Sequence, residues 1–170
     1  MRFIEVYLGI KNYLKNNTLF ISLRDMKERG YFGIGIYNPK TKHNLGTLWR
    51  SAYQMGASFI FLIKSRYKVQ CSDTYKAYRH IPLFQFKDWK AFKTSRVYDC
   101  PVVAVEMGGD DIRTFSHPER CIYLLGAEDV GLPPKIVKEC NKCIELPSLR
   151  RQSFNVSVSG SIVMYDRLIK

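Results

Sequence analysis

The sequence lacks a hydrophobic run long enough to cross a membrane, because an α-helical span needs roughly 18 to 20 consecutive apolar residues. Even the apolar start of the chain is interrupted by Glu5. Internal repeats, low-complexity tracts and a Gly/Ser-rich linker are also missing from the 170 residues. With 46% hydrophobic and 14% aromatic content, the chain is typical of one folded domain with a substantial core. We expect a soluble, cytoplasmic protein that binds no membrane.

Several common catalytic motifs are missing as well. The sequence contains no phosphate-binding P-loop, no cluster of acids for a two-metal site and no nucleophile-base-acid arrangement around its histidines. Gly33-Ile34-Gly35 lacks the third glycine of the dinucleotide fingerprint and lies before or within an apolar run instead of after it. These absences exclude the familiar kinase, hydrolase and dinucleotide-binding chemistries.

Cysteines are few and odd in number, at five, which does not favour a disulfide framework. Cys140 and Cys143 form a C-x-x-C pair, but a structural zinc site needs a second pair of ligands. Only His117 and Cys121 are candidates for that role. Buried thiols are therefore favoured over zinc, and we expect no metal site.

Acidic residues are scarce in the first part of the chain. Residues 1–100 contain 18 Lys and Arg against 6 Asp and Glu, and residues 101–170 contain 9 against 9, so the first hundred residues carry the whole net charge of +12. A one-sided basic surface is typical of proteins that bind nucleic-acid phosphates. A cationic surface that serves solubility is the alternative.

The pattern of apolar residues predicts an amphipathic N-terminal extension over residues 1–32 and a second unit over residues 33–170. Short apolar runs suit buried strands at Phe32–Tyr37, Ser58–Lys64, Pro101–Met107, Cys121–Gly126 and Cys143–Leu146. Helical patterns separate several of them, one opened by Asn44 as N-cap and another by Pro133-Pro134. This alternation predicts an α/β fold with a mainly parallel sheet.

Two of these helical patterns carry further information. On the helix after Asn44, Arg50 and Ser51 fall on the face opposite to the apolar stripe. The last helical segment, 155–170, is rich in small residues, which let another backbone approach and hint at tight packing or self-association.

Three polar segments follow predicted strands, and together they form an ordered set of motifs. The first contains Asn38, Asn44, Gly46, Arg50 and Gly56. The second contains Gly126, Glu128, Gly131 and Leu132. The third contains Pro147, Ser153, Asn155, Val156 and Ser157, with Phe154 where leucine is usual. In this order the chain resembles the SpoU (TrmH-like) branch of the SPOUT RNA methyltransferases, over about residues 33–170.

The resemblance implies a parallel α/β sheet with a C-terminal trefoil knot, an exception to the rule of un-knotted chains. It also implies a pocket for S-adenosylmethionine within the knot. The cofactor-binding residues that it indicates are Val105, Glu106, Met107, Gly126, Leu146, Ser153 and Asn155. We expect Gly126 to let the chain approach the ligand closely.

The implied reaction is methyl transfer to a ribose 2′-hydroxyl of structured RNA. The catalytic residues that the resemblance indicates are Arg50, Asn44, Glu128 and Asn155. Because a guanidinium stays protonated in proteins, we assign Arg50 to a phosphate clamp instead of a general base. Transfer RNA is favoured over ribosomal RNA, because the separate N-terminal RNA-binding domain of many ribosomal members is absent.

The resemblance also implies a homodimer with Arg50 near the partner's pocket, acting on RNA and not on DNA. The residues expected to contact RNA are Lys40, Lys42, Arg50, Lys76 and Arg79. Two alternatives stay open. One is an RNA-binding protein of the same fold that does not catalyse, since fold does not fix function. The other is a methyl acceptor on a base nitrogen or oxygen.

Overall fold

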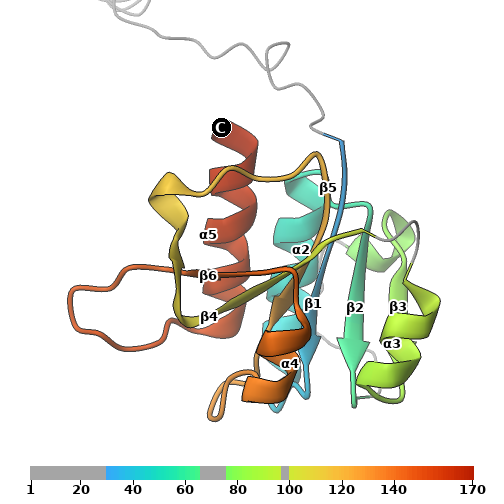
Figure 1. The fold of residues 1–170 in the computed structure, drawn as a ribbon. Helices are drawn as coiled ribbons and strands as arrows, with labels where there is room; N and C mark the ends of the chain where they lie inside the picture. Colours follow the sequence, from blue (N-terminus) through green and yellow to red (C-terminus); the bar gives the residue numbers. More distant parts are fainter. Residues whose placement is uncertain (1–29, 66–75, 97–99) are drawn as a thin grey trace, which may run out of the picture.

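The computed structural model describes residues 30–65, 76–96 and 100–170 (Figure 1). Its strands are β1 (Tyr31–Tyr37), β2 (Phe59–Ile63), β3 (Leu83–Phe86), β4 (Val102–Asp111), β5 (Arg120–Leu125) and β6 (Lys142–Glu145). Its α-helices are α2 (Lys42–Gln54), α3 (Trp89–Ser95), α4 (Pro134–Glu139) and α5 (Val156–Ile169), and two 3-10 turns are η1 (Ala77–Arg79) and η3 (Ile112–Thr114).

The N-terminal extension expected over residues 1–32 lies outside the described residues except for its last three. Strand β1 begins at Tyr31, so Tyr31 and Phe32 belong to the sheet and not to the extension. Within the described ranges, none of the helices has both the length and the apolar character needed to span a bilayer.

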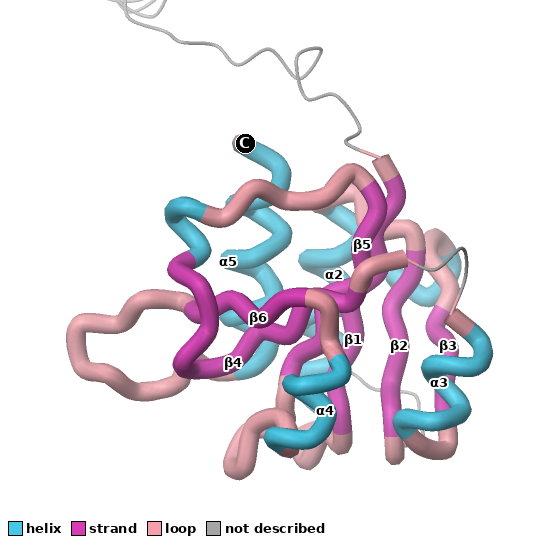
Figure 2. The backbone as a smooth tube through the Cα atoms, viewed as in Figure 1, coloured by secondary structure: helices cyan, strands magenta, loops and turns pink. Residues whose placement is uncertain are grey.

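The described strands form one sheet in the order β3-β2-β1-β5-β4-β6, and every pairing between them is parallel. Helices α2 and α5 cover one face of the sheet, and α3 and α4 lie on the other (Figures 1 and 2). The predicted α/β class with a parallel sheet is therefore confirmed. Strand β3 and helix α3 were not predicted, because Leu83–Phe86 is a short edge strand with two exposed residues and carries no continuous apolar run.

Two hydrophobic cores lie on the two faces of the sheet. Under α2 and α5 the core includes Ile34, Leu48 and Met164, all fully buried. Under α3 and α4 it is largely aromatic, with Phe61 and Phe92 stacked at 4.8 Å between ring centroids. Because parallel strands are buried on both faces, their sequences read as the unbroken apolar runs from which they were predicted.

The two glycines of β1 have a packing role. A Cβ atom on Gly33 would lie 2.2 Å from the ring of Phe59, and one on Gly35 would lie 2.5 Å from Phe61, so the phenyl rings of β2 occupy the space above β1. This close approach explains the Gly-Ile-Gly sequence without a nucleotide and agrees with the rejection of the dinucleotide motif.

The small residues of α5 accommodate α2. A Cβ on Gly160 would lie 2.4 Å from Leu48, and the Ser161 hydroxyl donates to the Ser51 hydroxyl at 2.9 Å. The expectation that Ser51 faces away from the core side of α2 is therefore wrong, since its hydroxyl meets α5. Tight packing of α5 on α2 within one chain therefore explains why the residues at 157, 160 and 161 are small.

We predict that Gly35→Ala destabilises the protein by about 1–3 kcal/mol, because the added methyl overpacks the contact with Phe61. Urea unfolding followed by circular dichroism measures this change. Thr47→Ala, at an exposed position of α2, is the control and should leave the midpoint unchanged. Equal midpoints for Gly35→Ala and wild type would show that Phe61 moves aside without loss.

Candidate functional site

The site lies where the direction of the sheet order reverses. From β1 the sheet extends through β2 and β3 on one side. On the other side β1 pairs with β5, and the sheet continues through β4 and β6. The order therefore reverses between β1 and β5. In open parallel sheets, ligands bind in the crevice outside the carboxyl ends of the strands at such a reversal. The loops after β1 and β5 meet at this point, through hydrogen bonds to Glu128.

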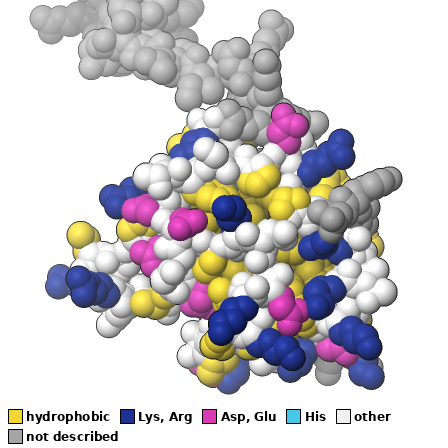
Figure 3. Space-filling model, viewed as in Figure 1, with side chains coloured by type: hydrophobic (Ala, Val, Ile, Leu, Met, Phe, Trp, Pro, Cys, Tyr) yellow, Lys and Arg dark blue, Asp and Glu magenta, His cyan; other side chains and the backbone are white. Residues whose placement is uncertain are grey.

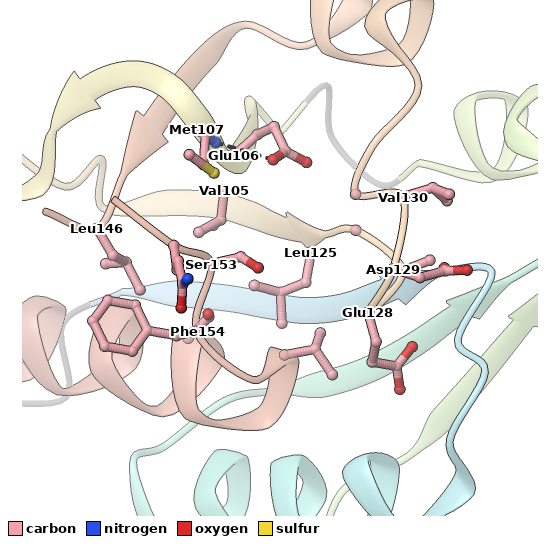
Figure 4. A pocket seen from close by; sticks show the side chains of 16 residues that line it. Val105, Glu106, Met107, Leu125, Glu128, Asp129, Val130, Leu146, Ser153 and Phe154 are labelled. Carbon is pink, nitrogen blue, oxygen red and sulfur yellow. Dashed lines mark hydrogen bonds between the residues drawn. The ribbon is translucent and has the colours of Figure 1, made fainter. Parts of the chain in front are cut away.

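A pocket of about 290 Å³ opens at this edge, between residues 105–107 of β4, the ends of β5 and β6, and the segment before α5 (Figure 4). In Figure 4, Leu146, Ser153 and Phe154 lie on one side of the pocket and Glu128 and Asp129 on the other. The described lining consists of Val105, Glu106, Met107, Leu125, Gly126, Ala127, Glu128, Asp129, Val130, Gly131, Leu146, Gln152, Ser153, Phe154, Val156 and Ser159.

Six of the seven residues expected to bind the cofactor line this one pocket. They are Val105, Glu106, Met107, Gly126, Leu146 and Ser153. The seventh, Asn155, is the N-cap of α5, and its side-chain oxygen accepts from the backbone N–H of Ser157 at 2.9 Å. Segments more than forty residues apart in the sequence therefore converge on one cavity.

Glu106 holds two parts of the pocket wall together. One carboxylate oxygen accepts from the backbone N–H of Leu132 at 2.6 Å, and the other accepts from the N–H of Met107 at 3.0 Å. The loop after β5 is thereby tied to the end of β4. Gly131 makes this possible, because its φ of +62° favours glycine and a Cβ there would lie 2.4 Å from the Glu106 carboxylate.

Gly126 lines the pocket and permits a tight turn beside it. A Cβ on Gly126 would lie 2.4 Å from the backbone of Gly131, so the close approach is to the chain's own loop. Residues Ala127 and Gly131 form an isolated antiparallel bridge across this loop. This contact gives Gly126 a packing role, and the approach of a ligand at Gly126 stays a prediction.

Glu128 connects the loops after β1 and β5. Its carboxylate accepts from the backbone N–H groups of Lys40 and Thr41, each at 3.0 Å, and from the Asn44 side-chain amide at 2.7 Å. Partial burial disfavours the charged carboxylate, but these hydrogen bonds outweigh it, and the pKa of Glu128 lies below its ordinary value. Glu128 is therefore ionised at neutral pH.

Asn44 extends this connection to α5. The Asn155 amide donates to the Asn44 side-chain oxygen at 3.0 Å, while Asn44 donates to Glu128. Asn44 is not the N-cap that the sequence suggested, since α2 begins at Lys42 and Thr41 is the cap. Its side chain is engaged instead in a hydrogen-bond chain from Asn155 through Asn44 to Glu128, and this arrangement brings together three of the four expected catalytic residues.

Arg50, the fourth, is not among the residues that line the pocket. It is exposed on α2, six residues after Asn44, or about 9 Å along the helix axis. Of the other residues expected to contact RNA, Lys40 forms an ion pair with Asp129, and Lys76 and Arg79 are exposed around η1. The side chain of Lys42 lies outside what the structure describes.

Figure 3 shows the face that carries α3 and α4, where Lys and Arg side chains are interspersed with Asp and Glu. One such pair joins Lys93 of α3 to Glu139 of α4 at 2.5 Å. The basic residues on this face therefore do not form an uninterrupted patch.

Cys140 and Cys143 are partly buried, free thiols. Burial raises the pKa of Cys140 to about 12 and that of Cys143 above its ordinary value, so both are protonated at neutral pH. Among the described residues, no group of three or more His, Cys, Asp or Glu side chains is placed to hold a metal ion.

Sequence reasoning did not assign Val156 and Ser159, in the first turns of α5, to the pocket. The small residues of that helix were read as a packing signal alone. The backbone donors of Lys40, Thr41 and Leu132 were also missed, because a backbone N–H leaves no mark on the sequence.

Solved structures share this architecture. An AdoMet-bound rRNA methyltransferase from Sinorhizobium meliloti superposes with a TM-score of 0.72 at 25% identity, covering 81% of this chain and 56% of that one. A structure solved to explain the 2-OH methylation of C/U34 on tRNA superposes with a TM-score of 0.73 at 19% identity. The match covers 82% of this chain and 95% of that one. At that lower identity the likeness shows the fold alone. The fold is thus the parallel α/β fold of these RNA methyltransferases.

The model of the SpoU rRNA Methylase family matches residues 32–165, and the chain belongs to this family. An uncharacterized tRNA/rRNA methyltransferase of Archaeoglobus fulgidus is 25% identical over 142 residues, which cover 80% of this chain and 63% of the relative. The tRNA (guanosine(18)-2′-O)-methyltransferase TARBP1 of Mus musculus is 27% identical over 136 residues, covering 72% of this chain and 8% of that protein. The chain thus spans less than two thirds of either relative, and the family resemblance drawn from the three motifs is confirmed.

We predict that Glu128→Gln destabilises the protein at pH 7 by about 1–3 kcal/mol, because one amide oxygen cannot serve three donors. The folded pKa of Glu128 is lowered, so its stabilisation is complete above the ordinary value of 4.5 and is lost as pH falls through the folded pKa. The gap between wild type and variant should therefore narrow below pH 4.5.

Urea unfolding across this pH range measures the gap. Glu139→Gln is the matched control, since Glu139 accepts from Lys93 and Trp89 at an exposed site and should leave the midpoint close to wild type. A gap for Glu128→Gln that stays constant with pH would contradict the role of its charge.

Proposed function

We propose that this protein is an S-adenosylmethionine-dependent RNA methyltransferase that acts on a ribose 2′-hydroxyl of structured RNA, with transfer RNA favoured over ribosomal RNA. The observation that carries the proposal is the pocket between β4 and the ends of β5 and β6, whose lining residue Glu128 is hydrogen-bonded to Asn44 and, through Asn44, to Asn155. The AdoMet-bound relative from Sinorhizobium meliloti supports the choice of cofactor.

The residues of the pocket fit this cofactor. Glu106, Glu128 and Asp129 contribute three carboxylates, and no lysine or arginine is present in the described lining. Such a lining disfavours a phosphate-bearing nucleotide and suits a ligand with sulfonium and ammonium charges, with Val105 and Leu146 as apolar walls. The volume of 290 Å³ is near the lower limit of about 300 Å³ for small-molecule sites. Once bound, S-adenosylmethionine supplies an already activated methyl group.

We also propose the trefoil knot. Residues 146–156 join edge strand β6 to α5, which packs on α2 on one face of the sheet. On the way, Leu146, Ser153 and Val156 line the same pocket as residues 105–107 of β4 and the loop after β5. Threading of this segment through the loop after β4 accounts for that convergence.

The chain's own residues have two tasks in this reaction. Arg50 binds the RNA phosphate next to the target ribose through its planar guanidinium, which positions the hydroxyl and stabilises negative charge as the oxygen bonds to the methyl group and the proton passes to water. Asn44, Glu128 and Asn155 hold the start of α2 and the start of α5 against the loop after β5. They are positioning residues for the pocket in this assignment.

The substrate class rests on relatives. TARBP1 of mouse is named for 2′-O-methylation of a tRNA guanosine, and the S. meliloti protein is an rRNA methyltransferase. Lys40, Lys42, Lys76 and Arg79 are the further residues that we assign to RNA contact. A protein of this fold that binds RNA without catalysis is the alternative outcome of the experiment below.

The decisive experiment has two parts. Calorimetric titration with S-adenosylmethionine should give a dissociation constant on the order of micromolar, equivalent to about −8 kcal/mol. Incubation with labelled cofactor and with bulk tRNA or rRNA, followed by nucleoside mass spectrometry, should then show a methylated ribose. A methylated base would replace the ribose assignment, and cofactor binding without RNA methylation would favour the non-catalytic alternative.

We predict that Arg50→Ala lowers methyl transfer by about a hundredfold while binding S-adenosylmethionine within a few-fold of wild type, because the interaction acts in the transition state. Arg50→Lys should restore only part of the rate, since lysine cannot bind a phosphate in bidentate fashion. Single-turnover rates at saturating cofactor measure methyl transfer by the two variants. Full activity of Arg50→Ala would remove Arg50 from the mechanism.

Because Arg50 does not line its own chain's pocket, we propose that it serves the pocket of a second protomer in a homodimer. Helix α5 supplies a suitable surface. Val158, Ile162, Tyr165 and Ile169 recur at helical spacing on its outer side and are 37–56% exposed. An exposed apolar stripe of this kind is typical of a protein interface.

We predict that Ile162→Glu converts the dimer to a monomer, because it places a charge in the centre of this stripe. Light scattering after gel filtration measures the mass. Phe84→Glu, on the opposite face of the sheet, should leave the mass unchanged. If Ile162→Glu has the same mass as wild type, the stripe on α5 is not the interface.

A further inference from the structure

Aromatic rings gather at the end of α2 and around η1, away from the pocket. The rings of Tyr53 and His80 are stacked, with centroids 4.4 Å apart and planes at 19°. The ring of Tyr78 meets Trp49 edge-on at 6.5 Å. We call Tyr53, Tyr78, Arg79 and His80 the aromatic ledge.

A buried residue of α2, Trp49, ties the chain after η1 to α2 from the core side. Trp49 is buried, and its indole N–H donates to the Ile81 carbonyl at 3.2 Å. Tyr53 and Tyr78, in contrast, are 38% and 47% exposed. Large rings that stay exposed beside a buried anchor offer surface to a partner.

The charge around the ledge selects the partner. The guanidinium of Arg79 lies 5.8 Å from the centre of the Tyr78 ring, and Lys76 precedes it at the N-cap of η1. From residue 38 to residue 87 the chain contains nine Lys and Arg but only one acid, Asp73. Exposed rings among cations are the combination that binds unpaired nucleotides, because bases stack on rings and phosphates meet the cations.

The ledge also continues the surface that carries Arg50. Tyr53 follows Arg50 by three residues, so the two are neighbours on α2, about 5 Å apart along the helix axis. Both are exposed. An RNA strand with a phosphate on Arg50 and running toward the end of α2 would therefore reach the rings of Tyr53 and Tyr78.

We propose that the aromatic ledge binds an unpaired base of the RNA substrate by stacking on Tyr53 and Tyr78, with Arg79 and Lys76 on the flanking phosphates. This inference rests on the proposed function for the identity of the RNA as substrate. It assigns to the ledge a base-binding role that is separate from the cofactor pocket and from catalysis.

The test compares two labelled probes in fluorescence anisotropy: a short unstructured RNA, and an oligonucleotide of the same length and charge that lacks bases. Wild type should bind the RNA about tenfold or more tightly than the baseless probe. The double variant Tyr53→Ala/Tyr78→Ala should lose this difference and keep the affinity for the baseless probe. Tyr53→Phe/Tyr78→Phe, which retains the rings, should behave as wild type.

Phe84→Ala is the matched control, because Phe84 is as exposed as Tyr78, at 47%, but packs on Phe59 in the core on the other face. It should keep the preference for bases. A preference that persists in the double alanine variant, or is absent from wild type, overturns the proposal. The proposal is also overturned if the double alanine variant changes its oligomeric mass but binds RNA as wild type does. That result would make the ledge a protein interface.

The failure of the ledge and the failure of the proposed function give different results. If wild type methylates RNA but the double alanine variant keeps its base preference, the ledge falls and the methyltransferase stands. If wild type binds no S-adenosylmethionine but loses base preference on the double substitution, the ledge stands and the methyltransferase falls.

Discussion

The carboxylate of Glu128 is the interaction on which the candidate site depends. It accepts hydrogen bonds from two backbone N–H groups after β1 and from Asn44, and Asn44 in turn accepts from Asn155. Three segments that are distant in the sequence thereby meet at one edge of the sheet. Because Glu128 is ionised, each of the three bonds that its carboxylate accepts is stronger than a bond between neutral groups. Removal of this acceptor deprives the loop after β1 and the start of α2 of three hydrogen bonds and leaves the Lys40–Asp129 ion pair to connect the loops after β1 and β5.

The two surfaces that the proposed reaction needs have opposite charge. The pocket lining carries Glu106, Glu128 and Asp129, whereas the segment from residue 38 to residue 87 carries almost only basic charge. Phosphates are repelled from an acidic pocket and attracted to a basic surface. In the proposed reaction, this difference in charge favours the cationic cofactor in the pocket and keeps the RNA phosphates outside it.

The sequence predicted those parts of the molecule whose residues carry their own signal. Buried parallel strands read as apolar runs, and Gly126, Glu128, Ser153 and Asn155 stand in motifs. Edge strand β3 was missed because half of it is exposed, and Asn44 was taken for a helix cap because its distant partners are invisible locally. The tie from Glu106 to Leu132 could not be predicted, since its donor is backbone. A hydrogen bond whose donor is a backbone N–H can be located only from the three-dimensional structure, since every residue type except proline carries that group.

Asn155 has two tasks with one side chain. Its oxygen caps α5 at Ser157, and its amide nitrogen holds Asn44. Fraying of the first turn of α5 and loss of the hydrogen bond to Asn44 are therefore coupled through this one side chain. The amide protons of Ser157 and Val158 report on this coupled opening through their hydrogen exchange. Local opening at a helix end becomes, in this protein, a measure of how often Asn155 holds Asn44.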